Sequence, residues 1–98
     1  MYAVSFYSVA PERFNDVRAV YPRHRAYLDE FATRGEVIMI GTFGNPAEQG
    51  SMAIFRSRDA AERFRENDPF FLEGLIGESK ILDWDPLEFP AATENSQN

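Results

Sequence analysis

The sequence predicts an α+β fold whose elements follow the order strand, helix, strand, strand, helix, strand. Three observations indicate this order. Runs rich in β-branched and aromatic residues lie near both ends of the chain, two apolar stripes have helical spacing, and a loop bounded by two glycines joins the middle strands. The 98 residues are enough for one small domain.

The first strand is expected over residues 2–9, where Val4 and Phe6 share one face of the strand. Pro11 ends it, because proline cannot donate to a strand ladder. Residues 12–19 are polar with scattered apolar side chains, and they predict a loop or a weak helical turn.

The first regular helix is expected to run from Pro22, as its N1 residue, to about Arg34, with Gly35 as the stop after its last turn. His24, the only histidine of the chain, lies inside the apolar stripe of this helix. Such an imidazole is either a core side chain satisfied by one hydrogen bond or a group at the floor of a pocket. The stripe consists of Val17, Val20, Tyr21, Leu28 and Phe31.

Two further strands and a loop follow. Residues 37–43 form a nearly continuous apolar run that is typical of a central strand, and residues 51–56 form the strand that returns beside it. Residues 44–50 predict the loop between them, because Asn-Pro and two flanking glycines disfavour regular structure.

The second helix is expected to open with the capping box Asp59-x-x-Glu62 and to end near Glu66 or Asn67. It ends there because the chain reaches a proline two or three residues later, and the residue before a proline avoids helical geometry.

Asp68-Pro69 therefore forms a rigid break just beyond the second helix, followed at once by two phenylalanines. The carboxylate at such a corner has two possible roles. It is either a partner for the imidazole of His24 or the N-cap of the turn that begins at Pro69. Both roles are compatible with one another.

The last strand is expected over residues 78–85, after a short turn or helix at residues 70–75. Residues 1–88 are predicted to form a single domain. Residues 89–98, rich in Pro, Ala, Thr, Asn, Gln and Ser, are predicted to be a flexible tail that is disordered or lies against a partner.

This order of elements is the ferredoxin-like, or split βαβ, arrangement, with two helices on one face of a four-stranded antiparallel sheet. The other face would be open. Because the strands carry many Tyr, Phe, Met and Ile residues, an open face would expose a large apolar patch, which monomers rarely tolerate. We therefore expect a homodimer in which a second copy covers that face, giving a dimeric α+β barrel.

Composition narrows the classes of function. The net charge is -6, and the acidic excess lies entirely in residues 41–98, which argues against nucleic acid or an anionic membrane as partner. The chain has no cysteine and one histidine, which argues against disulfides, a cysteine nucleophile or a transition-metal site. No run approaches the ~20 apolar residues that span a bilayer, and no signal peptide is recognisable. We expect a cytoplasmic protein without metal or cofactor.

Two motifs resemble those of the YCII-related (YciI-like) family: Tyr21-Pro-Arg-His24-Arg-Ala-Tyr-Leu28, and Asn67-Asp68-Pro69-Phe70 followed by Gly74-Leu75. The resemblance extends over residues 1 to about 88 and includes Gly35, Gly41 and the Gly50-Ser51 pair. The chain differs from the family at Tyr21, where an arginine is common, and it has Arg23 beside the histidine instead.

The resemblance implies a ferredoxin-like dimer with a His–Asp site at His24 and Asp68 and with Ser51 nearby. A related member is a dehydrochlorinase that acts on a chlorinated hydroxyhydroquinone, and muconolactone isomerases share the broader fold. These relationships imply small, oxygenated, cyclic substrates, by analogy of fold.

We expect His24 to act as general base or acid, oriented by Asp68, in the elimination or isomerisation of a small cyclic or phenolic substrate. Two alternatives remain open: a non-catalytic small-molecule-binding or regulatory dimer, and a cofactor-independent monooxygenase. Four further residues are candidates for binding the substrate, although each is also compatible with an ordinary core or strand position: Ser51, Tyr7, Phe70 and Trp84.

Overall fold

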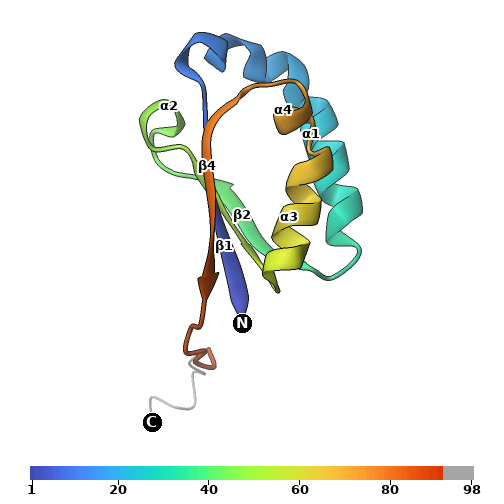
Figure 1. The fold of residues 1–98 in the computed structure, drawn as a ribbon, viewed down its shortest axis with the longest axis vertical. Helices are drawn as coiled ribbons and strands as arrows, with labels where there is room; N and C mark the ends of the chain where they lie inside the picture. Colours follow the sequence, from blue (N-terminus) through green and yellow to red (C-terminus); the bar gives the residue numbers. More distant parts are fainter. Residues whose placement is uncertain (92–98) are drawn as a thin grey trace.

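The computed structural model describes residues 1–91 and contains a four-stranded sheet with the strand order β2-β3-β1-β4 (Figure 1). All neighbouring strands are antiparallel. This is the ferredoxin-like α+β arrangement, and the predicted fold class is confirmed. The strands are β1 (Tyr2–Val9), β2 (Val37–Thr42), β3 (Ser51–Phe55) and β4 (Ile76–Trp84).

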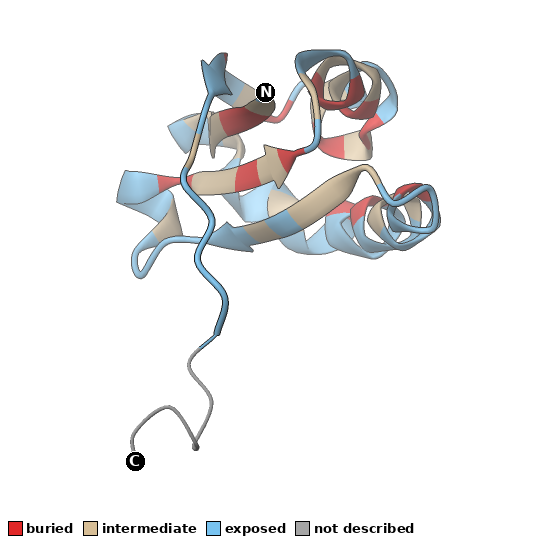
Figure 2. Cartoon of the chain, turned by 90° about the horizontal axis from the view of Figure 1, so that it is seen from below, coloured by how far each residue is buried: buried red, intermediate tan, exposed pale blue. Residues whose placement is uncertain are grey.

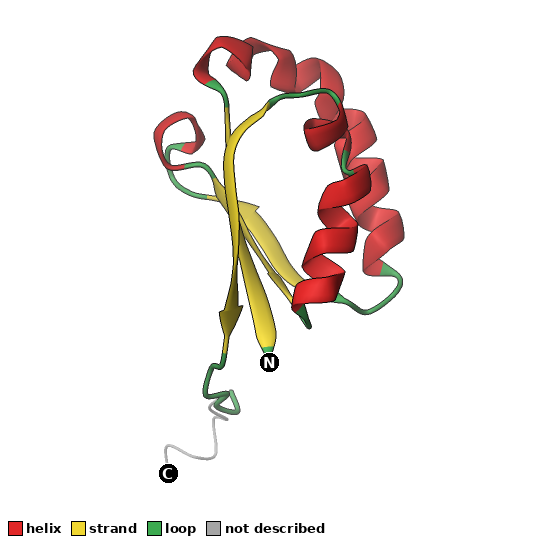
Figure 3. Cartoon of the chain, in the orientation of Figure 1, coloured by secondary structure: helices red, strands yellow, loops and turns green. Residues whose placement is uncertain are grey.

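The main helices cover one face of this sheet, as Figure 3 shows. The covering layer consists of α1 (Val17–Ala32), α3 (Arg58–Asn67) and the one-turn helix α4 (Pro69–Leu72). A 3₁₀ helix, η1 (Pro11–Asp16), leads from β1 into α1, and another one-turn helix, α2 (Pro46–Gln49), lies in the loop between β2 and β3. None of the helices within residues 1–91 combines the length and apolarity needed to cross a membrane.

Both long helices begin differently from the sequence expectation. Helix α1 begins at Val17, so Pro22 lies inside it rather than at N1. The proline is on the exposed side, and burial of Val20 and Phe31 on the other side compensates for the backbone hydrogen bond that it removes. Helix α3 is capped by Ser57, whose hydroxyl accepts a 3.1 Å hydrogen bond from the Ala60 amide, and the expected capping box is not formed.

The strand expected at the centre of the sheet, β2, is an edge strand. Its apolar run does not reflect burial within one chain, since Met39 is 66% exposed. Continuous apolarity is typical of strands that are covered on both faces, and β2 would be covered in this way only if something packed on its outer face.

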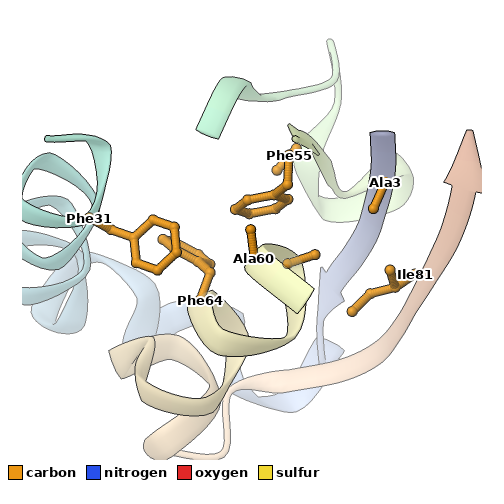
Figure 4. Close-up of a cluster of buried hydrophobic side chains, with 8 residues drawn as sticks. Ala3, Phe31, Phe55, Ala60, Phe64 and Ile81 are labelled. Atoms are coloured by element: carbon orange, nitrogen blue, oxygen red, sulfur yellow. The ribbon is translucent and has the colours of Figure 1, made fainter. Parts of the chain in front are cut away.

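The main core lies between the sheet and helices α1 and α3 (Figure 4). Phe31 of α1 meets Phe64 of α3 edge to face, with ring centroids 5.2 Å apart, and Phe55 of β3 packs against Phe64 at 5.4 Å. These rings are almost fully buried. Burial of each such side chain stabilises the fold by about 1.5–3 kcal/mol, so this cluster fixes the position of both helices on the sheet.

No helix within residues 1–91 lies over the opposite face of the sheet. The core side chains Ala3, Ala53, Phe55 and Ile81 lie on the helical face by strand register, and their neighbours along each strand lie on the outer face. Figure 2 shows buried residues both in the strands and in the helices. This outer face carries many apolar side chains, as the composition of the strands led us to expect. Its members, by strand register, include Val4, Phe6, Met39, Met52, Ile54, Leu82 and Trp84.

Candidate active site

His24 and Asp68 meet in the interior of the protein. Nδ1 of His24 lies 2.7 Å from Oδ1 of Asp68, and the two side chains are 6% and 0% exposed. An ionised carboxylate can only accept hydrogen bonds, so Nδ1 carries the proton and donates it. This fixes the tautomer of the neutral ring and leaves Nε2 as the nitrogen with a free lone pair.

Asp68 is placed by the break between two helices. It is the C-cap of α3 and the N-cap of α4, with the extended dihedral angles φ -66° and ψ 124° that a residue before proline favours. Its Oδ1 also accepts a 3.2 Å hydrogen bond from the amide of Phe70. The two roles considered for this carboxylate, capping residue and imidazole partner, are therefore filled at the same time.

The second carboxylate oxygen of Asp68, Oδ2, is buried and has no hydrogen-bond partner among the described residues. An unsatisfied buried acceptor costs about 1–3 kcal/mol. Within the described residues, the carboxylate of Asp68 is therefore held by hydrogen bonds to Oδ1 alone, from His24 and from the Phe70 amide. If Nε2 takes up a proton, His24 becomes an imidazolium, and its contact with the Asp68 carboxylate becomes an ion pair. The carboxylate therefore stabilises the protonated form of the ring.

Phe70 holds the imidazole from the side. Its ring stacks on that of His24 with centroids 4.0 Å apart and an angle of 8° between the planes. Phe64 contacts the same imidazole edge to face at 6.5 Å. One hydrogen bond and these aromatic contacts therefore restrict rotation of the His24 ring.

His24 forms part of the wall of a cavity of about 420 Å³ between α1, α4 and the ends of β1, β2 and β3. The lining is mainly apolar and contains no arginine or lysine. Some of the lining residues were not candidates in the sequence analysis. Strand register and the path of η1 place them at the cavity, and no local sequence motif marks them. The lining includes aromatic, hydroxyl-bearing and aliphatic side chains as well as the imidazole: Tyr7, Phe14, Tyr21, His24, Ile40, Thr42, Ser51 and Phe70.

Tyr7 and Ser51, both expected near the substrate, lie opposite one another in the pairing of β1 with β3, on the helical side of the sheet. Gly50 makes this pairing possible, because a Cβ atom at its position would lie only 2.5 Å from the carbonyl oxygen of Tyr7. Burial raises the pKa of Tyr7 to about 12, and the charge of Asp68 adds to the increase, whereas the Ser51 hydroxyl acts in the opposite direction.

Trp84 does not join this group. It pairs with Tyr2 in the register of β4 with β1, and this position lies on the outer face of the sheet. We expected Trp84 in the same cavity as His24, but it does not line this cavity. Side chains alternate between the two faces of a strand, and Trp84 falls on the outer face. Phe70, by contrast, lies in the cavity wall as expected.

Within the part of the chain that the structure describes, no three or more His, Asp or Glu side chains are clustered closely enough to hold a metal ion. Tyr21, at the position where the resemblance implied an arginine, has its ring 5.8 Å from that of His24 and is 45% exposed at the mouth of the cavity. The site therefore combines an imidazole–carboxylate pair with an apolar wall and several hydroxyl groups, among them those of Tyr7 and Ser51.

The fold and this site define a ferredoxin-like α+β domain with a candidate acid–base pair between its helices and its sheet. The sequence profile of the YCII-related domain matches residues 1–85. The chain belongs to the YCII-related family, which confirms the resemblance found in its motifs. The match ends short of residue 88, so that boundary stays a prediction, and residues 92–98 of the predicted tail lie outside the described residues.

Solved structures similar to this one include 5-chloro-2-hydroxyhydroquinone dehydrochlorinase from Burkholderia phenoliruptrix AC1100, in complex with 2,5-dihydroxybenzoquinone. It is 24% identical, the alignment covers 87% of this chain and 94% of that chain, and the TM-score is 0.69. This likeness shows the fold. Comparison with curated protein sequences gives no significant match.

The cofactor-independent oxygenase SnoaB from Streptomyces nogalater is also similar, in two structures. A single-site mutant has a TM-score of 0.48 at 19% identity, over 88% of this chain and 93% of that one. The second structure has a TM-score of 0.44 at 19% identity, over 88% and 91% of the two chains.

Proposed function

We propose that this protein is an acid–base enzyme that needs no cofactor, in which His24 transfers a proton to or from a small cyclic or phenolic substrate and Asp68 orients the imidazole. The observation that carries the proposal is the 2.7 Å contact between the two buried side chains, with His24 in the wall of an apolar cavity. A general base must have its free nitrogen facing a space where a substrate can bind.

The proposed reaction begins when Nε2 of His24 accepts a proton from an O–H or an acidic C–H of the substrate. The bonding electron pair stays on the substrate, and the imidazolium is stabilised by Asp68. The same nitrogen then returns the proton, either to a departing group, which leaves with its own electron pair, or to another atom of the ring. The first outcome is an elimination and the second an isomerisation.

The cavity favours an uncharged ring as the substrate. Its wall is mainly apolar, and the nearest buried charge is the carboxylate of Asp68, which would repel an anion. Because the similar dehydrochlorinase was solved with 2,5-dihydroxybenzoquinone, chlorinated hydroquinones and hydroxyquinones are the first compounds to test.

The test is a screen of chlorinated hydroquinones, hydroxyquinones and unsaturated lactones for chloride release or ultraviolet change, with wild type, His24→Gln and Asp68→Asn. Turnover should fall by at least about 100-fold in His24→Gln and less in Asp68→Asn. Arg25→Gln is the matched control, because Arg25 follows His24 on α1 but is exposed and pairs with Asp29. Tight binding of a compound without turnover would favour the ligand-binding alternative, and oxygen uptake with a quinol would favour the monooxygenase.

We also propose that a second copy of the chain covers the open face of the sheet. The support is the set of apolar side chains left on that face, among which Met39, Leu82 and Trp84 are 66%, 48% and 42% exposed. Patches of this kind mark interaction surfaces in proteins that are otherwise well packed. Two copies packed sheet to sheet would form the dimeric α+β barrel.

A further inference from the structure

We propose that Tyr7 is a second catalytic group of this site, whose hydroxyl donates a hydrogen bond to the substrate oxygen that becomes negatively charged when His24 removes a proton. This inference rests on the proposed function. The His24–Asp68 pair accounts for the proton transfer, and Tyr7, on the sheet side of the cavity, would stabilise the negative charge left on the substrate.

The position of Tyr7 is fixed by the sheet rather than by a loop. It lies on β1 between Ser51 of β3 and Ser79 of β4 in the strand register. Its side chain is on the helical side of the sheet, as is the cavity, and it lines this cavity together with His24. A substrate in the cavity would thus lie between the imidazole on the helical layer and the phenol on the sheet.

The hydroxyl of Tyr7 is available to a ligand. The hydroxyls of Tyr2 and Tyr27 donate at 2.9 Å to a carboxylate oxygen of Glu88 and to the carbonyl oxygen of Phe64. Within residues 1–91 the Tyr7 hydroxyl makes no such bond to a carboxylate or carbonyl oxygen. Its hydrogen-bonding neighbour is the Ser51 hydroxyl, and when that hydroxyl donates to the phenol oxygen, the Tyr7 O–H remains free to donate to a ligand. An amphipathic side chain of this kind combines an apolar ring with a donor that can point into the site.

Tyr7 acts in this step as a neutral donor rather than as a second base. Because burial and the charge of Asp68 raise its pKa to about 12, the phenol stays neutral at any pH at which a histidine serves as a base. The other titratable groups near it are Tyr21 and the His24–Asp68 pair. None of them supplies a cation to a substrate oxygen until His24 itself takes up the proton.

The charges balance in the proposed step. The proton moves from the substrate to Nε2, the electron pair remains on the substrate oxygen, and the imidazolium is paired with Asp68. The Tyr7 O–H then hydrogen-bonds to the new oxyanion without transferring its own proton. A neutral donor aimed at the position where charge develops lowers the energy of the transition state more than that of the ground state.

The experiment uses 4-nitrophenol as the probe, because its phenolate absorbs visible light and its neutral form does not. The proportion of bound probe that is ionised is measured for wild type, Tyr7→Phe, His24→Gln and Tyr2→Phe, together with the affinity for the neutral probe in acidic buffer. Tyr2→Phe is the matched control, since Tyr2 lies on the same strand but on the outer face. Urea unfolding verifies that each variant folds.

We expect wild type to bind the probe largely as phenolate, and Tyr7→Phe to reduce the ratio of bound phenolate to bound phenol by about 10-fold to 100-fold. Affinity for the neutral probe should change little in Tyr7→Phe, and Tyr2→Phe should match wild type. A merely structural role of Tyr7 would instead weaken both forms of the probe equally, and this result would overturn the proposal.

The outcomes separate this inference from the proposed function. If His24→Gln abolishes ionisation of the probe and Tyr7→Phe leaves it unchanged, the role of Tyr7 is refuted and the acid–base function stands. If wild type neither binds nor ionises the probe, or if His24→Gln behaves as wild type, both proposals are refuted for phenolic substrates.

Discussion

At the scale of single residues, one carboxylate connects the fold to the site. Asp68 ends α3, caps α4 and binds His24, and these roles depend on the proline that follows it. The sequence identified this residue because Asp-Pro after a helix is a local signal. It could not show that Phe70 would stack on the imidazole at 4.0 Å, since stacking depends on the path of the turn after the proline.

The raised pKa of Tyr7 predicts a loss of stability at alkaline pH. Because the folded-state value of about 12 exceeds the ordinary value of 10.0, the protonated phenol stabilises the fold fully below pH 10, and this contribution is lost as the pH rises toward 12. The loss should be about 2 kcal/mol in the free energy of unfolding. Urea unfolding at a series of pH values should show a smaller loss in Tyr7→Phe, and equal losses in the two proteins would contradict the prediction.

At the scale of elements, the sequence predicted which segments are helices and strands better than where they begin. Apolar periodicity spans many residues, so it survives local irregularities such as Pro22 within α1. A helix start depends on the backbone angles of one residue. Ser57 adopts the extended conformation of a cap, with φ -155° and ψ 162°, and no feature of the pattern distinguishes it from Asp59 two residues later.

The cap of α3 can be tested by two alanine substitutions. Ser57→Ala should reduce the free energy of unfolding by about 1 kcal/mol, because the Ala60 amide loses its acceptor. Asp59→Ala, the matched comparison, removes an exposed pair with Arg63 and should cost less than Ser57→Ala, because solvent screens the pair. Chemical denaturation of both variants gives the two values. A larger effect at Asp59 would show that the capping box operates after all.

The turn before β3 gives a second prediction at this scale. Gly50 has φ +74°, and an added Cβ atom would lie 2.5 Å from the carbonyl oxygen of Tyr7. Gly35 has nearly the same φ of +73° but nothing within 4 Å of that position. Gly35→Ala should cost about 1 kcal/mol from backbone strain alone, and Gly50→Ala about 3 kcal/mol or more. Equal unfolding midpoints for the two variants would refute the close packing of β1 on this turn.

At the scale of the whole molecule, the predicted fold class is correct because the order of elements leaves few alternatives. Right-handed crossovers place both long helices on one face, and the other face is then open. The apolar run of β2 indicated a central strand, yet β2 is at the edge. An apolar run does not by itself distinguish a strand buried within its own chain from one at the edge of the sheet.

The proposed dimer predicts a specific response to charge on the open face. Wild type should sediment with twice the mass of one chain, and Leu82→Glu should weaken association by about 100-fold, because a carboxylate would be buried between the sheets. Leu72→Glu is the matched control, since Leu72 is 64% exposed on α4, in the helical layer. Analytical ultracentrifugation over a range of concentrations measures both. A monomeric wild type, or equal effects of the two substitutions, would refute the dimer.

The measurement that tests the central claim most directly is nitrogen NMR of His24, in wild type and in Asp68→Asn. The chain has one histidine, so the ring signals need no assignment. In wild type the neutral ring should carry its proton on Nδ1 and show an unprotonated Nε2, because the carboxylate 2.7 Å away can only accept. In Asp68→Asn the other tautomer should appear. A wild-type ring protonated on Nε2, or identical spectra for the two proteins, would contradict the pairing on which the proposed chemistry depends.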